Sequence, residues 1–279
     1  MNIDDGDGTG VRIALINLAT LYASTSPARS IVPRELVLEL AEALRDQEHI
    51  AITHLFLMWD YAWAGLFERA EASYAAFQRL PTPASRATYR LGDAEFRYCW
   101  LRFFQGTLTD QLLRDAESAA EDGNSRVISR MLLRLRGEFA LQRGNLSNAI
   151  TGFEKCIEMT QAAGMSATDV EARLALALAR KGDLEQARRV LERVREPAPG
   201  LELAELYLEL GDREKARHHA LVGYGQVWAD GPTYSYWWYL KRCRAVLEAL
   251  GEPEPKLPAY DPNTAEPIPH EAERPRPDR

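Results

Sequence analysis

Histidine and cysteine are the residue types in this chain best suited to binding a metal or attacking a substrate, but their spacing supports neither role. His49 and His54 would lie on different faces of a helix, and the adjacent His218 and His219 diverge, so no two imidazoles can share a metal ion. The cysteines are far apart and odd in number, which is typical of reduced, buried thiols, and no signal pairs one with a histidine as a nucleophile. They are Cys99, Cys156 and Cys243.

Two loops that bind phosphate or calcium in other proteins are also missing. No Gly-x-x-x-x-Gly-Lys-Ser/Thr segment occurs, so an ATPase activity would have to come from another chain. Asp5, Asp7 and Thr9 resemble the start of a calcium loop, but the twelfth position holds Ile16 where a glutamate is needed. The sequence therefore predicts a protein that is not an enzyme, with no catalytic residues, no cofactor and no metal.

Helices must position whatever site the chain has. Between residues 10 and 250 the apolar residues recur at helical spacing, and no segment alternates like a half-buried strand. With 46% hydrophobic and 27% charged residues, the composition is that of an ordinary globular protein. We therefore predict an all-α fold.

Charge and hydropathy argue against two classes of partner. The net charge of −7 comes mostly from the two ends of the chain, and the nearly neutral body argues against direct binding of nucleic acid. No apolar run approaches the ~20 residues that cross a bilayer, and the N-terminal residues do not resemble a signal peptide. We expect a cytoplasmic protein with no membrane contact.

Glycines that break the helical pattern recur at intervals of about one helical hairpin. The intervals are 41, 38, 38, 29 and 40 residues, between Gly65, Gly106, Gly144, Gly182, Gly211 and Gly251. Such a recurrence is typical of a solenoid, in which each unit buries its apolar face against the next. The alternative is a generic helical bundle that happens to contain these glycines.

The residues around these glycines also repeat. Asn145 after Gly144, and Asp183 after Gly182, are placed to cap the next helix. Five residues after four of the glycines comes an alanine: Ala70, Ala149, Ala187 and Ala216. Seven residues before four of them lies another small residue: Cys99, Gly137, Ala175 and Ala204. Together these positions resemble the tetratricopeptide repeat, in which a small residue of the first helix meets an alanine of the second.

The resemblance is good over about residues 125–223, partial at 50–80 and poor at 82–122, where Gln111 replaces the alanine. Most intervals exceed the 34 residues typical of the family, so longer helices are expected. Longer repeats of this kind occur in the arrays of bacterial signalling ATPases and transcription activators. The resemblance implies a right-handed superhelical solenoid of antiparallel helix pairs.

Five segments are predicted along the chain. Residues 1–9 form a disordered acidic N-terminus, 10–48 two capping helices, 49–223 the repeats, 224–251 an aromatic-rich C-terminal cap and 252–279 a proline-rich acidic tail. The capping helices are expected at Val11–Tyr22 and at Pro33–Gln47, with Pro33 in the first turn. The tail is expected to be extended or mobile, because it has few apolar groups to bury.

The aromatic-rich segment carries a second resemblance. Seven of the sixteen residues from Tyr224 to Tyr239 are aromatic. The runs 228–234, 243–251 and 257–262 resemble a terminal module of bacterial tetratricopeptide proteins, many of which look like sensors for nucleotide-driven signalling or immune effectors. The alternative is a C-terminal cap whose rings shield the last hairpin and hold residues 257–260.

In a tetratricopeptide array the first helix of each unit lines a concave groove. Counting back from the turn glycines, the groove positions are aromatic in the first half of this chain and include arginines in the second half. We predict that they bind a helix or extended segment of a partner, with rings as apolar anchors and arginines as forked donors to its acidic side. The predicted partner-binding residues are Trp59, Trp63, Phe96, Trp100, Phe104, Arg134 and Arg180.

Both parts of this surface have an alternative interpretation. The rings can instead belong to the core or be covered by the first two helices, because an open apolar trough of this size invites aggregation. Arg126, Arg130 and Arg134 share one helix face, which suits binding to phosphate or an acidic segment. The alternative is a solvated face paired with local acids such as Asp122 and Glu138.

Two functions follow from these observations. The first is a scaffold, adaptor or sensor that binds a protein or peptide partner in its groove, with a signalling ATPase or effector as the partner that the resemblance implies. The second is a regulatory subunit that binds a small ligand and modulates a partner signalling enzyme or transcription factor. A closed apolar pocket with convergent polar groups would favour the second function, and an open groove the first.

Overall fold

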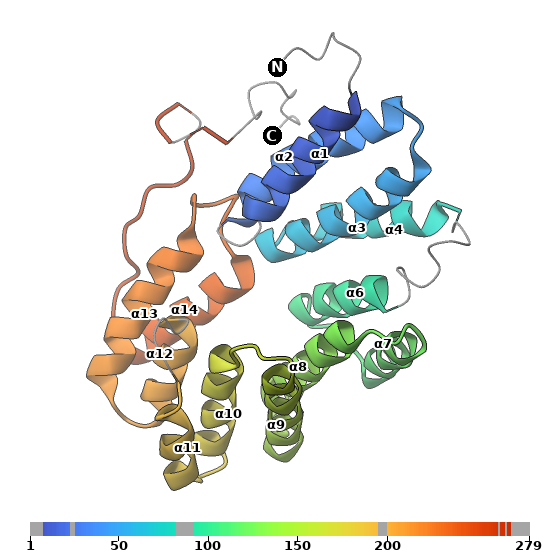
Figure 1. Cartoon of the computed structure of the whole chain (residues 1–279). Coiled ribbons are helices and arrows are strands. Elements are labelled where there is room, and N and C mark those ends of the chain that lie inside the picture. The colour runs from blue at the N-terminus through green and yellow to red at the C-terminus, as the bar shows by residue number, and fades with distance from the viewer. Residues whose placement is uncertain are drawn as a thin grey trace. The chain divides into compact units, whose positions relative to one another are not determined.

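The computed structural model describes residues 8–22, 26–81, 92–194, 200–261, 263–265 and 267–268. In this part of the chain every regular element is an α-helix, which confirms the all-α prediction (Figure 1). Of the predicted terminal segments, residues 1–7 and 269–279 lie outside the described part. The helices are α1 (Gly8–Tyr22), α2 (Pro27–Ala43), α3 (Gln47–Ala64), α4 (Phe67–Arg79), α6 (Asp93–Phe104), α7 (Asp110–Asp122), α8 (Arg126–Gln142), α9 (Leu146–Ala162), α10 (Thr168–Arg180), α11 (Leu184–Leu191), α12 (Gly200–Glu209), α13 (Arg213–Trp228) and α14 (Trp237–Leu250).

The chain forms two compact units. Unit 1 consists of residues 1–87, 227–238 and 256–279, and unit 2 of residues 88–226 and 239–255. Unit 1 therefore holds α1 to α4 together with two segments from the C-terminal part of the chain. Unit 2 holds α6 to α12 and most of α13 and α14.

Helix pairs joined by short turns follow one another in unit 2, with α8 beside α9 and α10 beside α11 (Figure 1). The second helix of each pair starts at a side-chain cap. The Asn145 side-chain oxygen accepts a hydrogen bond from the Asn148 amide at 3.3 Å, and the Asp183 carboxylate accepts one from the Gln186 amide at 3.1 Å. Both caps were predicted from the residues that follow the turn glycines.

Small residues allow the paired helices to approach closely. A Cβ atom at Gly137 of α8 would lie 2.5 Å from the Phe153 ring of α9, and one at Gly152 would lie 3.1 Å from the Gly137 nitrogen. The repeated small residues elsewhere in unit 2 are fully buried: Cys99, Ala149, Ala175, Ala187, Ala204 and Ala216. The small positions of the predicted repeat therefore lie where adjacent helices meet.

The second capping helix does not begin where the sequence predicted. It starts at Pro27, because the Ser26 hydroxyl accepts a hydrogen bond from the Arg29 amide at 3.4 Å and the first helical position tolerates a proline. Pro33 consequently lies inside α2 rather than in its first turn, which corrects the prediction.

The predicted end of the same helix at Gln47 is also wrong. Helix α2 ends at Ala43, and α3 begins at Gln47. The cause is the Asp46 carboxylate, which accepts a hydrogen bond from the His49 amide at 3.1 Å and so starts a new helix.

Polar side chains are buried between α2, α3 and α4 of unit 1. The Arg34 guanidinium donates to the Asp60 carboxylate at 2.5 Å, and both side chains are almost fully buried. The neighbouring Glu35 carboxylate accepts hydrogen bonds from the Tyr61 hydroxyl and the Arg69 guanidinium. Burial raises the pKa of Tyr61 to about 12, so its hydroxyl remains a donor.

The first C-terminal segment of unit 1 is held against α2 by an acidic side chain. The Asp230 carboxylate accepts hydrogen bonds from the Ser26 hydroxyl and from the Arg29 guanidinium, each at 2.8 Å. Burial alone would raise the pKa of Asp230, but these two donors outweigh it and hold the pKa below its usual range.

The second C-terminal segment packs on the first. The Trp228 indole donates a hydrogen bond to the Pro258 carbonyl at 2.8 Å, and the Tyr234 and Tyr260 rings meet edge to face with centroids 5.0 Å apart. Ile268 lies buried in an apolar cluster with these tyrosines and with α2. Pro258 and Tyr260 are therefore held by the aromatic run, as the interpretation as a C-terminal cap predicts.

The turn between α3 and α4 is restricted to glycine for two reasons. Gly65 has a φ of +77°, a conformation that other residues adopt only with strain, and a Cβ atom there would lie 2.6 Å from the Trp237 ring. Trp237 also packs edge to face on Phe67 at 5.0 Å, so it cannot move away without losing this contact. Gly106 has a similar φ of +74° but open space around it.

We predict that Gly65→Ala lowers the free energy of unfolding by clearly more than Gly106→Ala does. The second substitution carries only the backbone strain, about 1–2 kcal/mol, whereas the first must also displace Trp237. Urea unfolding followed by circular dichroism measures both losses. Equal losses in the two variants would show that the contact with Trp237 is unimportant.

Candidate functional site

Charged side chains link the first helices of successive repeats in unit 2. Glu138 on α8 is bonded to Arg173 on α10, 35 residues later, and Arg173 to Glu205 on α12, 32 residues later. Glu205 is bonded in turn to Arg242 on α14, 37 residues further on. We refer to Glu138, Arg173, Glu205 and Arg242 as the charge ladder.

Arg173 occupies the middle of the charge ladder. Its Nε and Nη2 atoms donate to the two carboxylate oxygens of Glu138 at 2.7 and 2.5 Å, and its Nη1 atom donates to Glu205. The guanidinium thus forms a forked pair with one repeat and a third bond with the next. The side chains of Glu138 and Arg173 are only 3% and 5% exposed.

Arg242 closes the other end of the ladder with a second forked pair. Its Nε and Nη2 atoms donate to the Glu205 carboxylate at 2.9 and 2.5 Å. Its Nη1 atom lies 3.7 Å from the carboxylate of Glu202, which is also buried on α12. Glu202 and Glu205, one helical turn apart on α12, therefore both lie within ion-pair distance of Arg242.

The two glutamates of α12 respond to burial in opposite ways. Burial would raise the pKa of Glu205, but Arg242 and Arg173 outweigh it and lower the pKa to about 2. At Glu202 burial is stronger than the attraction of the same arginines, and the pKa is raised. The folded state therefore favours an ionised Glu205 and disfavours the ionised form of Glu202.

Two further pairs lie at the more exposed edge of these helices. The Arg134 guanidinium of α8 is bonded to Asp169 of α10, and Arg180 Nε of α10 lies 3.3 Å from Glu209 of α12. The arginine side chains are 26% and 39% exposed. We refer to these two as the rim pairs. Exposed pairs of this kind contribute little stability, about 0–1 kcal/mol each.

The predicted site residues Arg134 and Arg180 therefore lie on α8 and α10, the first helices of their repeats. Each is already paired with a carboxylate from the first helix of the next repeat. The sequence reading did not name Arg173, Glu205 or Arg242 as site residues. A usable signal existed, because charges of alternating sign recur from 138 to 242 at intervals of roughly one repeat.

The aromatic part of the predicted surface differs from expectation. Phe96, Trp100 and Phe104 of α6 are buried, with only 1–5% of each residue exposed. Trp100 packs on Phe103 and Phe104 with centroids 5.4 and 5.3 Å away. These three rings do not present the open trough that the sequence predicted, and their role in binding a partner stays a prediction.

Trp59 and Trp63, the other two predicted rings, belong to unit 1. They lie half-buried on α3 and meet edge to face with centroids 5.5 Å apart. Trp63 is also 6.3 Å from the Tyr236 ring, so one of its sides is covered by the first C-terminal segment.

The run of arginines on α8 does not form one binding patch. Arg136 is bonded to Glu117 and Arg143 to Asp110, both on α7, whereas Arg134 turns to α10. Of the predicted face Arg126, Arg130 and Arg134, pairing with an acid is confirmed for Arg134, which is bonded to Asp169 and is also attracted by the nearby Glu138 carboxylate. Arg130 instead places its Nη1 atom 2.8 Å from the Met165 sulfur.

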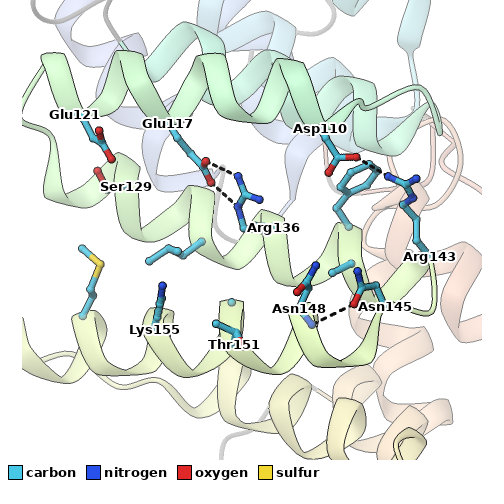
Figure 2. Close-up of a pocket in the computed structure, with 15 residues that line it drawn as sticks. Asp110, Glu117, Glu121, Ser129, Arg136, Arg143, Asn145, Asn148, Thr151 and Lys155 are labelled. Atoms are coloured by element: carbon cyan, nitrogen blue, oxygen red, sulfur yellow. Dashed lines mark hydrogen bonds and ion pairs between the residues drawn. The ribbon is translucent and has the colours of Figure 1, made fainter.

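An open groove of about 930 Å³ lies between α7, α8 and α9 (Figure 2). Figure 2 shows Glu117 and Asp110 reaching from α7 to Arg136 and Arg143 on α8, while Asn148 and Lys155 line the α9 side. The sequence analysis did not predict this groove. It considered only the first helix of each repeat, whereas the walls of the groove come from the second helices α7 and α9.

The three cysteine thiols of the chain are buried. Burial raises the pKa values of Cys99 and Cys243 to about 12, and that of Cys156 is raised as well, so these thiols stay protonated. Among the described residues no three His, Cys, Asp or Glu side chains converge as metal ligands, and no helix is long and apolar enough to cross a membrane.

Residues 173–199 match the family described as tetratricopeptide repeat, within the region where the sequence resemblance is good. The match begins at Arg173 of the charge ladder and covers the rest of α10 and all of α11. A comparison with curated proteins found no matching relative. The family match and the paired helices together support a tetratricopeptide-type helical repeat protein.

We predict that Glu205→Gln lowers the free energy of unfolding by about 3 kcal/mol at neutral pH, because it leaves two buried guanidinium groups without their shared charge. The stabilisation by Glu205 is present above its ordinary pKa of 4.5 and is lost as the pH falls toward 2. The deficit of the variant, measured by urea unfolding, should therefore shrink over that window.

Glu202→Gln is the matched control on the same helix. A raised pKa means that the folded state prefers the neutral acid, which glutamine imitates, so no loss of stability is expected at neutral pH. Equal losses in both variants at pH 7 would contradict the opposite roles assigned to the two glutamates.

Proposed function

We propose that this tetratricopeptide-type helical repeat protein is a non-catalytic adaptor or sensor module that binds a segment of a protein partner. Repeats of this family are typical of protein–protein interaction modules. The finer expectations, a right-handed superhelix and a cytoplasmic location, are part of the same proposal. The resemblance to repeat arrays of bacterial signalling ATPases and transcription activators suggests an effector of such a system as the partner.

The observation that carries the proposal is the contrast between the charge ladder and the rim pairs. The ladder is buried, and each of its arginines is bonded to two or more carboxylate oxygens. An acidic group of a partner would therefore not readily replace these carboxylates. Arg134 and Arg180 are partly exposed, and each forms an ion pair with one carboxylate, although Glu138 and Glu202 also attract Arg134 from nearby. An acidic partner can replace Asp169 and Glu209 at little cost, because the exposed pairs are weak.

We propose that the half-buried edges of Trp59 and Trp63 in unit 1 supply apolar anchors for a protein partner. Large rigid rings commonly carry much of the binding energy in interfaces. Phe96, Trp100 and Phe104 would need to be uncovered before they could contribute, since they are buried. The arginines and the tryptophans belong to different units and are therefore tested in separate variants.

The alternative function is a regulatory subunit that binds a small ligand and modulates a partner enzyme or transcription factor. It would need an enclosed pocket with convergent polar groups. The groove between α7, α8 and α9 is partly open rather than an enclosed cavity, which favours a protein segment as the ligand.

The test is affinity purification of the tagged chain from its native cells, with quantitative mass spectrometry. For Arg134→Ala/Arg180→Ala we expect recovery of the partner to fall about tenfold, which corresponds to about 1.4 kcal/mol of binding free energy. The matched control is Arg188→Ala/Arg189→Ala, which removes two exposed arginines from α11.

The same experiment with Trp59→Ala/Trp63→Ala tests the apolar anchors. Circular dichroism melting curves must first show that each variant is folded. Undiminished recovery with the Arg134/Arg180 variant would refute the role of the rim pairs. Absence of any partner, together with a small molecule that raises the melting temperature, would favour the regulatory-subunit alternative.

A further inference from the structure

The groove between α7 and α9 is lined by a regular row of side chains from α8. The row consists of Ser129, Leu133, Arg136, Ala140 and Arg143, which are spaced alternately four and three residues apart, and Phe139 lines the groove beside the row. This is the spacing with which one helix presents a seam to another helix packed along it. The row lies on the side of α8 that faces away from the charge ladder. With 3.6 residues per turn, Arg134 and Glu138 project from roughly the opposite side of the helix.

The size of the groove fits one side of a helix. From Ser129 to Arg143 the row extends over fourteen helical steps, or about 21 Å at 1.5 Å per residue. Half of a helix about 10 Å wide and of that length occupies roughly 800 Å³. The cavity volume of about 930 Å³ is close to this value.

Most of the charge in the groove is already compensated. Arg136 forms a forked pair with Glu117 across the space between α7 and α8, and Arg143 is paired with Asp110. These two pairs bind the wall formed by α7 to the floor formed by α8. Because each pair is neutral overall, the groove has little net charge and does not favour a purely acidic or a purely basic ligand.

Two opposite charges remain on the facing walls. Glu121 on α7 and Lys155 on α9 both line the groove, and neither side chain has an ion-pair partner among the described residues. Figure 2 places the two on opposite sides of the α8 row. Leu133 of α8 and Met159, which lies one turn from Lys155 on α9, supply apolar surface in the same groove. A ligand that lies along the groove therefore meets a negative edge, an apolar centre and a positive edge.

We propose that this groove docks an amphipathic α-helix of about four turns from a protein partner. Its apolar stripe rests on the partly exposed Leu133 and Met159, a basic side chain meets Glu121, and an acidic side chain on the opposite edge meets Lys155. This surface is separate from the rim pairs, and it can bind whether or not the rim pairs do. The opposed charges fix which edge of the helix faces α7.

The probe is a displayed library of 16-residue helical peptides with a fixed apolar stripe and with lysine or glutamate varied along both edges. Peptides selected on the full chain should carry basic residues on one edge and acidic residues on the other. Their affinity should fall at least tenfold for Thr151→Trp, which adds bulk at an exposed position of the groove.

A charge exchange tests the orientation. The variant Glu121→Lys/Lys155→Glu should bind the selected peptides at least tenfold more weakly and should prefer peptides whose charged edges are interchanged. The matched control is Glu185→Lys/Arg189→Glu on α11, which exchanges an exposed pair outside the groove and should leave affinity unchanged. Equal melting temperatures establish that all variants are folded.

Four results would overturn the proposal. They are a library that yields no helical binder, binders that are indifferent to both groove variants, bound peptides that circular dichroism shows to be extended, and self-association of the chain that Thr151→Trp abolishes. The last result would identify a second copy of the chain as the occupant.

Discussion

The guanidinium of Arg173 is the charge on which the geometry of unit 2 depends, because carboxylates of two neighbouring repeats share it. Glu138 precedes it by one repeat and Glu205 follows by one, and all three side chains are largely shielded from solvent. Removing one partner from such a buried pair costs about 3–5 kcal/mol. Apolar contacts between repeats tolerate small shifts, whereas each bond of the charge ladder requires a match within hydrogen-bond distance. The ladder therefore fixes the register of α8, α10 and α12 more tightly than apolar packing alone.

One helix, α8, contributes both to the buried charge ladder and to two more exposed surfaces. Glu138 contributes to the buried ladder, Arg134 to a partly exposed rim pair, and the row from Ser129 to Arg143 to the groove on the other side. Because the ladder satisfies the buried charges internally, the proposed binding of a partner to the rim pairs or to the groove would leave the contacts between repeats intact. A repeat with two independent surfaces can hold two segments of one partner, or two partners, at a fixed spacing.

Unit 1 is completed by parts of the chain that are distant in sequence. Helix α2 is contacted by the C-terminal part of the chain, through the bonds of Asp230 to Ser26 and Arg29 and through the apolar contact of Ile268 with Val32. Loop closure over two hundred residues adds only a modest entropic cost compared with a shorter loop, since the cost grows with the logarithm of loop length. The large sequence separation of these segments therefore adds little to the entropic cost of their contacts.

The sequence by itself determined the all-helical class, the turns at the glycines, the caps at Asn145 and Asp183 and the small residues between paired helices, but not the bounds of α2. All of these depend on patterns within a few residues of each other. Only the tertiary structure decided that Arg173 joins Glu138 to Glu205, that Phe96, Trp100 and Phe104 are buried, and that Asp230 reaches Ser26. The physical reason is that exposure and pairing depend on which surfaces the helices turn toward one another, and no local pattern contains that information.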